Sequence, residues 1–182
     1  ENIDKHFGIT HALDNVSFTF NKGEIHALIG ENGSGKSTLT SCLTGIYQKD
    51  SGKFILEGKE ITATNQVEAN HQGVAIIVQE IGTLSGLTVA ENIFLGNEDQ
   101  FTKYGIKNTA AMNKKAQEYL DSYGFNYIDA TKVIDDYNFE DRKLVEIVKS
   151  TYFNPKVLVV DETTTALGQK GREELFKVMH KV

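Results

Sequence analysis

The sequence predicts an α/β fold with a mostly parallel sheet, to which an antiparallel β subdomain and a helical subdomain are added. Two runs, 74–78 and 157–160, are apolar at every position, as expected for strands buried on both faces of a parallel sheet. A third run, 24–29, is mostly apolar and leads into a glycine-rich loop. All three runs end in glycine or polar residues, and ligands of α/β proteins bind at the carboxyl ends of the strands.

The composition is that of an ordinary globular domain and excludes several classes. The 182 residues suffice for one domain, and the net charge of −6 comes without a basic run, which argues against a nucleic-acid-binding surface. No apolar stretch approaches the ~20 residues that span a bilayer. The single cysteine, Cys42, excludes an internal disulfide and is expected in the core. The histidines show no paired metal-ligand spacing, so the only metal expected is nucleotide-borne Mg²⁺.

The first elements are predicted to be antiparallel strands. Val16, Phe18 and Phe20 alternate with polar residues, and a turn at 21–23 separates them from the run 24–29. A further short strand over 53–56 is followed by a turn.

Residues Gly30 to Ser37 match the phosphate-binding pattern G-x-x-x-x-G-K-[ST]. Its glycines allow backbone N–H groups to wrap around phosphate oxygens, Lys36 supplies positive charge to the β- and γ-phosphates, and the Ser37 hydroxyl is placed for Mg²⁺. A chance glycine-rich turn is the ordinary alternative, but the strand before the loop and a helix after it favour a nucleotide site. That helix is predicted from an apolar face and a glycine near its end: Leu39, Cys42, Leu43, Ile46 and Gly45.

The middle of the chain is predicted to be helical. Thr88 and Glu91 form a capping box, and three further helices are indicated by the sets Met112, Ala116, Leu120; Leu144, Val145, Ile147, Val148; and Glu173, Leu175, Phe176, Val178. We therefore expect one domain over 1–182, with a nucleotide-binding core at 1–81 and 153–182 and a helical subdomain at 82–152.

Polar residues directly follow the two buried strands. Gln79 follows the run 74–78, and Asp161 and Glu162 follow the run 157–160. Each alone would usually be a loop or surface residue. Their common placement predicts that three strand ends converge on one nucleotide.

With these motifs the chain resembles the ATPase domain of ATP-binding cassette (ABC) transporters, and in particular the N-terminal cassette of ribose-, galactose- or xylose-type carbohydrate importers. The phrases that carry the resemblance are ALIGENGSGKSTL, LTGIY, IIVQE, LTVAENIFLGNE, VEIVKS and VLVVDE. They extend over almost the whole chain, and the combination is far more specific than the phosphate loop alone.

The resemblance implies ATP and Mg²⁺ as ligands and a role for each matching position. Phe7 would stack on adenine, Glu162 would be the general base, and catalysis would also involve Lys36 and Gln79. Mg²⁺ would be held by Ser37, Gln79 and Asp161. ATP would be bound by Phe7, Gly30, Asn32, Gly33, Ser34, Gly35, Lys36, Ser37 and Thr38.

The resemblance also implies partners and a location. They are a second cassette, a transmembrane permease that docks around 83–88 and, indirectly, a periplasmic or extracellular sugar-binding protein, with no nucleic acid. The chain would lie on the cytoplasmic face of the membrane, attached through the permease.

Three features depart from the family pattern. The segment Tyr137 to Asp141 stands where an L-S-G-G-Q signature is expected, and Glu140 there would repel a facing phosphate charge by about 3 kcal/mol at ~5 Å. Thr163 replaces a proline, and Gly168 replaces an aspartate. The expected switch histidine is missing, because His180 falls at the end of a helix. The chain stops at Val182 before the strand that would lead to this histidine, and it begins at Glu1 without an initiator Met, so we expect an excised, C-terminally truncated fragment. Because the switch histidine is missing, we expect the fragment to bind ATP better than it hydrolyses it.

Two other functions remain open from the sequence. One is a degenerate nucleotide-binding regulatory cassette with little hydrolysis, which the altered signature and Gly168 favour. The other is a soluble ABC ATPase outside transport, which the acidic composition disfavours.

Overall fold

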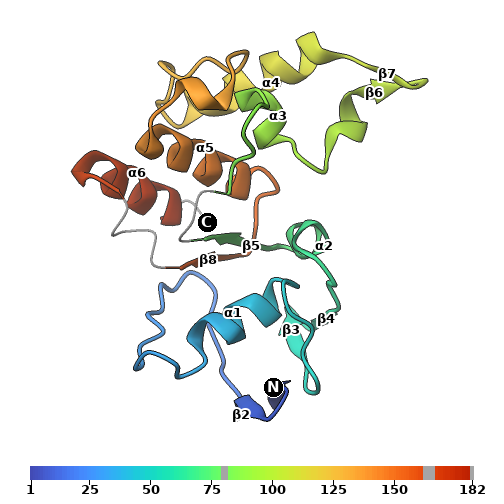
Figure 1. The fold of residues 1–182 in the computed structure, drawn as a ribbon, viewed down its shortest axis with the longest axis vertical. Coiled ribbons are helices and arrows are strands. Elements are labelled where there is room, and N and C mark those ends of the chain that lie inside the picture. Colours follow the sequence, from blue (N-terminus) through green and yellow to red (C-terminus); the bar gives the residue numbers. More distant parts are fainter. Residues whose placement is uncertain (79–81, 162–166, 181–182) are drawn as a thin grey trace. The chain divides into compact units, whose positions relative to one another are not determined.

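The computed structural model of the protein describes residues 1–78, 82–161 and 167–180. The chain forms two compact units, one of residues 1–76 with 155–159 and the other of residues 77–154 with 160–182. Figure 1 shows the elements of both units coloured along the sequence. Among the described residues, no helix combines the length and apolar character that crossing a membrane requires.

The first unit begins with the antiparallel strands β1 (Ile3–Phe7) and β2 (Thr10–Val16), followed by helix α1 (Lys36–Leu43). Ile3, Leu13 and Cys42 are buried together, so the inner face of the strand pair packs against α1. The prediction that Cys42 is a core residue is therefore confirmed.

The rest of this unit is a hairpin and a short helix. Strands β3 (Phe54–Leu56) and β4 (Lys59–Ile61) pair antiparallel across a turn, and helix α2 (Gln66–His71) follows. A second small core joins Ile61, Ala69 and Val74, with Val157 packed against it.

Strands β5 (Val74–Ile77) and β8 (Val157–Val160) pair with each other. The N–H of Val157 donates to the Gly73 carbonyl (3.1 Å) and that of Asp161 to the Ile77 carbonyl (3.0 Å), so the two strands run parallel. β5 is buried throughout, as predicted, whereas β8 is only half-buried.

Two predictions of strands are wrong. Residues 24–29 form no strand, with Ile29 88% exposed, and β2 ends at Val16, which leaves Phe18 and Phe20 more than half exposed. The physical reason is that a strand exists only through hydrogen bonds to a neighbour. Apolar pattern shows that a segment suits a strand, but it does not supply the partner.

The second unit is mainly helical. Its helices are α3 (Val89–Ile93), α4 (Thr109–Ser122), α5 (Phe139–Thr151) and α6 (Gln169–Met179), with α5 in contact with the other three (Figure 1). Two 3₁₀ turns, η1 (Glu98–Phe101) and η2 (Ile134–Asp136), and the two-residue strands β6 (Thr102–Lys103) and β7 (Ile106–Lys107) complete it.

The helix predictions are confirmed in most details. The capping box of Thr88 and Glu91 is present, the predicted faces of α4 and α5 are buried, and His180 follows the end of α6. One residue was wrongly included in the predicted apolar face of α1. Ile46 lies beyond α1 and is 45% exposed, because Gly45 turns the chain with φ +73°.

Candidate nucleotide-binding site

The phosphate loop leads directly into α1. Gly35 is the N-cap of this helix, with φ +86° and no side-chain hydrogen bond to the first turn. The first N–H groups of any helix lack a partner within the helix. An uncapped start therefore leaves donors for an anion, and the helix dipole adds positive potential there.

The glycines of the loop are required to different degrees. Gly33 and Gly35 both have positive φ, +85° and +86°. A Cβ on Gly35 would also lie 2.6 Å from the Ala12 carbonyl oxygen, whereas one on Gly33 would meet nothing within 4 Å. A Cβ on Gly30 would lie 2.5 Å from the Ser34 hydroxyl oxygen. The loop thus approaches β2 closely at Gly35 and folds on itself at Gly30.

Lys36 closes the loop. Its ammonium group donates to the carbonyl oxygens of Gly30 and Glu31, both at 2.9 Å. The side chain of Ser37, the next residue, is exposed at the same helix start. The ammonium, the uncapped amides and a nearby hydroxyl are the donor set that a triphosphate with Mg²⁺ requires, so these residues fit both ligands. Among the other predicted loop residues, Asn32, Gly33 and Ser34 are exposed and Thr38 is half-buried.

Phe7 lies at the end of β1, with 43% of its surface exposed. Its ring meets the Tyr47 ring edge to face at 5.2 Å, and the Lys5 ammonium lies 5.3 Å from its centroid. These contacts hold the ring while part of its surface stays open. Adenine stacking by Phe7 is therefore sterically possible and stays a prediction.

The predicted metal and catalytic residues are described only in part. Asp161 is half-buried, and its N–H bond to Ile77 extends the β5–β8 ladder by one residue. Gln79 and Glu162 lie outside the described residues. Because residues 24–29 form no strand, the predicted convergence of three strand ends is wrong for the first of them. That the ends of β5 and β8 meet at one nucleotide stays a prediction.

The altered signature segment has a defined local structure. The Asn138 side chain caps α5 by accepting a hydrogen bond from the Asp141 N–H at 2.9 Å. The Glu140 carboxylate accepts a hydrogen bond from the Gly171 N–H at 3.1 Å, in the first turn of α6. Asp141 accepts a hydrogen bond from the Tyr127 hydroxyl. Burial and this carboxylate raise the pKa of Tyr127 to about 12.

A buried ion pair that the sequence did not predict joins α5 to the residues on either side of 79–81. The Lys143 ammonium lies 2.8 Å from the Glu146 carboxylate and donates to the Val78 carbonyl at 2.6 Å. Glu146 accepts hydrogen bonds from the N–H groups of Val78 and Gly82, both at 3.3 Å. A local signal did exist, because Glu146 is a charged residue among the apolar positions of α5.

The segment around 83–88 is also held by contacts that were not predicted. Asp135 accepts hydrogen bonds from the Gly86 N–H (2.7 Å) and the Ser85 hydroxyl (2.9 Å), and these bonds hold the pKa of Asp135 below its usual value. The buried Asn92 side chain accepts from the Leu84 N–H and donates to the Leu84 carbonyl. No local pattern predicts the contacts of Asp135, because Ser85 and Gly86 lie 50 and 49 residues from it in the sequence.

Solved structures share this fold. The chain is similar to a nucleotide-free ATP-binding cassette from an ABC transporter, with a TM-score of 0.81 and 30% identity over 100% of this chain and 74% of that one. It is also similar to the ADP conformation of an ABC transporter cassette, with a TM-score of 0.78 and 32% identity over the same shares. The fold is therefore that of a P-loop ABC ATPase cassette.

The sequence comparisons define the family. The family described as ABC transporter matches residues 13–165. The chain is 41% identical over its whole length to the ribose import ATP-binding protein RbsA of Bacillus cereus, of which it spans 36%. It is 39% identical to the arabinose import ATP-binding protein AraG of Vibrio parahaemolyticus, of which it spans 35%. The chain belongs to the ABC transporter family and corresponds to its ATP-binding cassette.

Proposed function

We propose that this domain binds and hydrolyses ATP to drive the import of a carbohydrate through a membrane ABC transporter. The observation that carries the proposal is the phosphate loop 30–37, which ends at the uncapped start of α1 with Lys36 beside it. The relatives named for ribose and arabinose import support the class of cargo.

In this proposal the residues of the loop bind the phosphates. The backbone N–H groups at the start of α1 donate to phosphate oxygens. The Lys36 ammonium group gives up its hydrogen bonds to the carbonyls of Gly30 and Glu31 and donates instead to the β- and γ-phosphates. Ser37, Gln79 and Asp161 hold Mg²⁺, which neutralises phosphate charge when bound. Phe7 stacks on the adenine ring.

Hydrolysis then needs one general base. Glu162 orients a water molecule and accepts its proton, while the water oxygen forms a bond to the γ-phosphorus. The bond from this phosphorus to the β–γ bridging oxygen breaks, and ADP leaves with that oxygen. The backbone donors and Lys36 stabilise the negative charge that develops on the β-phosphate of the leaving ADP.

The proposed partners are a second cassette and a permease. The segment 83–88 docks on the permease, with Asp135 and Asn92 holding it in place. A cassette attached in this way lies on the cytoplasmic face of the membrane and reaches the sugar-binding protein only through the permease.

A degenerate regulatory cassette is the second candidate, and one observation favours it. The Glu140 carboxylate stands in the segment where the signature is expected and bonds to α6 of its own chain. A signature engaged in this way clamps the ATP of a facing cassette poorly.

The nucleotide site is tested by calorimetric titration of the chain with MgATP. The parent chain is expected to bind MgATP. Lys36→Ala is expected to lower the affinity at least about tenfold, because it removes the positive charge that contacts the phosphates. Lys59→Ala, which removes an exposed charge on β4, is the matched control. A parent chain that binds no MgATP would contradict the proposal.

The two candidate functions separate in the full-length protein with its permease. Sugar-stimulated ATP turnover in membrane vesicles is expected for the import ATPase. Nucleotide affinity with negligible turnover would select the regulatory cassette instead.

A further inference from the structure

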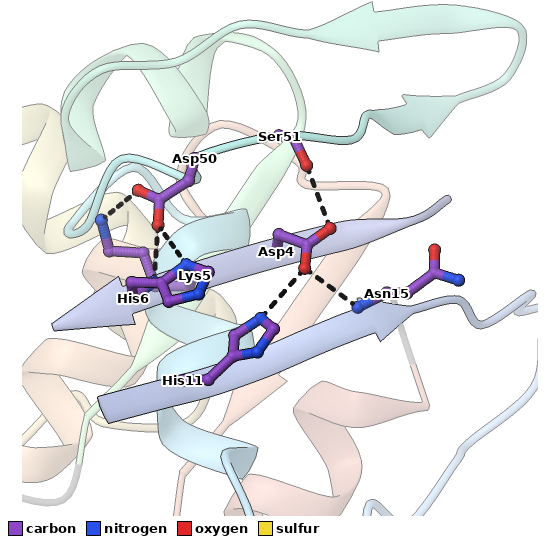
Figure 2. A network of polar contacts seen from close by, with 7 residues as sticks. All are labelled: Asp4, Lys5, His6, His11, Asn15, Asp50 and Ser51. Atoms are coloured by element: carbon purple, nitrogen blue, oxygen red, sulfur yellow. Dashed lines mark hydrogen bonds and ion pairs between the residues drawn. The ribbon is translucent and has the colours of Figure 1, made fainter. Parts of the chain in front are cut away.

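A cluster of imidazole and carboxylate groups lies on the outer face of the β1–β2 pair, separate from the phosphate loop. His11 Nε2 lies 3.1 Å from Asp4 Oδ1, and one ligand atom each of Asp4, His11 and Asp14 lies within 4.8 Å of the other two. Figure 2 shows the His11 ring directed from β2 toward the Asp4 carboxylate on β1.

An irregular strand register brings these three residues to one face. Residues three apart on a regular strand point to opposite faces, and His11 and Asp14 have this spacing. In the structure Lys5 pairs with Leu13 and the next residue, His6, pairs with His11, so that Ala12 is an extra residue in β2. Such a bulge re-aims side chains, which is why the sequence spacing alone gave no metal motif.

A second irregularity lies on the other side of Asp14. Ile3 pairs with Val16 while Lys5 pairs with Leu13, so one residue of β1, Asp4, lies opposite two of β2. The neighbouring Asn15 has φ +51°, and its N–H donates to Asp4 Oδ1 at 3.2 Å. Both irregularities therefore surround the same three side chains.

The groups around the cluster orient its members. Besides the hydrogen bond from Asn15, the Asp4 carboxylate accepts one from the Ser51 hydroxyl at 3.0 Å (Figure 2). The His11 ring stacks on His6 at 3.9 Å with the planes 12° apart. Hydrogen bonds from outside a metal site commonly fix its ligands in this way.

We propose that Asp4, His11 and Asp14 form a binding site for a divalent transition metal ion such as Zn²⁺. One imidazole nitrogen and two carboxylate oxygens are accepted ligands of zinc, with water in the fourth position. Tetrahedral ligands about 2.1 Å from the metal lie about 3.4 Å from one another. In the structure the three ligand atoms lie within 4.8 Å of one another, and the His11 and Asp14 side chains are exposed. The imidazole ligand distinguishes this site from one for Mg²⁺, which prefers oxygen.

The site is tested by calorimetric titration of the nucleotide-free chain with ZnCl₂. One equivalent is expected to bind, and His11→Gln and Asp14→Asn are each expected to weaken binding at least about tenfold, because each removes one of three ligands. His26→Gln is the matched control, since His26 pairs with Glu24 and lies outside the cluster. Absence of binding to the parent chain, or equal binding by the parent and both cluster variants, would overturn the proposal.

Two further measurements separate this site from the nucleotide site and from loss of the fold. Lys36→Ala is expected to keep zinc affinity, and excess Mg²⁺ is not expected to displace zinc. Imidazole NMR signals of His11 and of the stacked His6 should shift with one equivalent of zinc, while that of His26 stays in place. The cluster variants should keep the circular dichroism of the parent. A shift confined to histidines other than His6 and His11 would refute the assignment.

Discussion

The carboxylate of Glu140, in the first turn of α5, accepts a hydrogen bond from the backbone N–H of Gly171, in the first turn of α6, at 3.1 Å. Both glycines at the start of α6 make room for it. A Cβ would lie 2.8 Å from a Glu140 oxygen at Gly171 and 3.2 Å at Gly168. Glu140, one departure from the family pattern, thus bonds to α6 within its own chain, and Gly168, another departure, leaves space beside its carboxylate.

The first prediction follows from this contact. Replacing Glu140 with Gln removes a negative charge from the positive end of α6 and should destabilise the second unit by about 0.3–1 kcal/mol. Urea unfolding measures this loss, and amide exchange of Gly171 should become faster. Asn138→Ser is the matched control, because serine and asparagine are equivalent helix caps. Unchanged exchange at Gly171 in Glu140→Gln would show that the contact does not form in solution.

The same residue gives a prediction about turnover. In the full-length protein, Glu140→Gly combined with Asn138→Ser should raise ATP hydrolysis, because it restores a small neutral residue and a serine to the signature segment. The measurement is phosphate release in the presence of the permease. A rate no higher than that of the parent would mean that Glu140 does not limit the rate of ATP hydrolysis.

The buried pair Lys143–Glu146 gives a second prediction about stability. Its side chains are 0% and 6% exposed, so Lys143→Met leaves an uncompensated buried carboxylate and should cost about 3–5 kcal/mol of unfolding free energy. The control is the pair Lys177–Glu174, which has the same i,i+3 spacing but a Lys177 side chain that is 67% exposed. Lys177→Met should lower the free energy of unfolding far less, because water screens a charge on an exposed side chain. Similar losses for both variants in urea unfolding would contradict a buried pair.

Local chemistry explains which parts of the fold could be predicted. The capping box at Thr88 and Glu91 and the face of α4 with Met112 and Leu120 depend on residues three or four apart, so the sequence shows them directly. The phosphate loop is equally local, since its glycines and Lys36 act within eight residues.

The features that were missed depend on distant residues. Glu146 bonds to Val78, 68 residues away, and no periodicity encodes that distance. The bulge beside His11 arises from pairing with β1, and residues 24–29 show the opposite case, a suitable pattern without a partner strand. Strand pairing and buried polar contacts are tertiary properties, and sequence pattern only permits them.

Asp50 gives a prediction about pH. The Lys5 ammonium (2.9 Å) and the His6 N–H lower the pKa of Asp50 to about 2. A carboxyl group whose pKa is lower in the folded than in the unfolded protein stabilises the fold. This contribution is complete above the unfolded pKa of about 3.9 and is lost as the pH falls toward the pKa of the folded state. The urea midpoint of the parent should therefore exceed that of Asp50→Asn at pH 5, and the difference should shrink between about pH 4 and 2. Asp99→Asn controls for net charge, and a difference independent of pH would refute the assignment.

The last prediction compares two glycines of the phosphate loop that share one backbone conformation, Gly33 (φ +85°) and Gly35 (φ +86°). Alanine at either position carries the strain of a left-handed backbone, about 1–2 kcal/mol. At Gly35 the new Cβ also lies 2.6 Å from the Ala12 carbonyl oxygen and 2.9 Å from a Leu13 methyl carbon, and a backbone oxygen in a strand cannot move aside cheaply. Gly35→Ala should therefore lower both the urea midpoint and the affinity for MgATP more than Gly33→Ala does. Equal losses would mean that the loop does not approach β2, and then Gly35 would be required only for its φ.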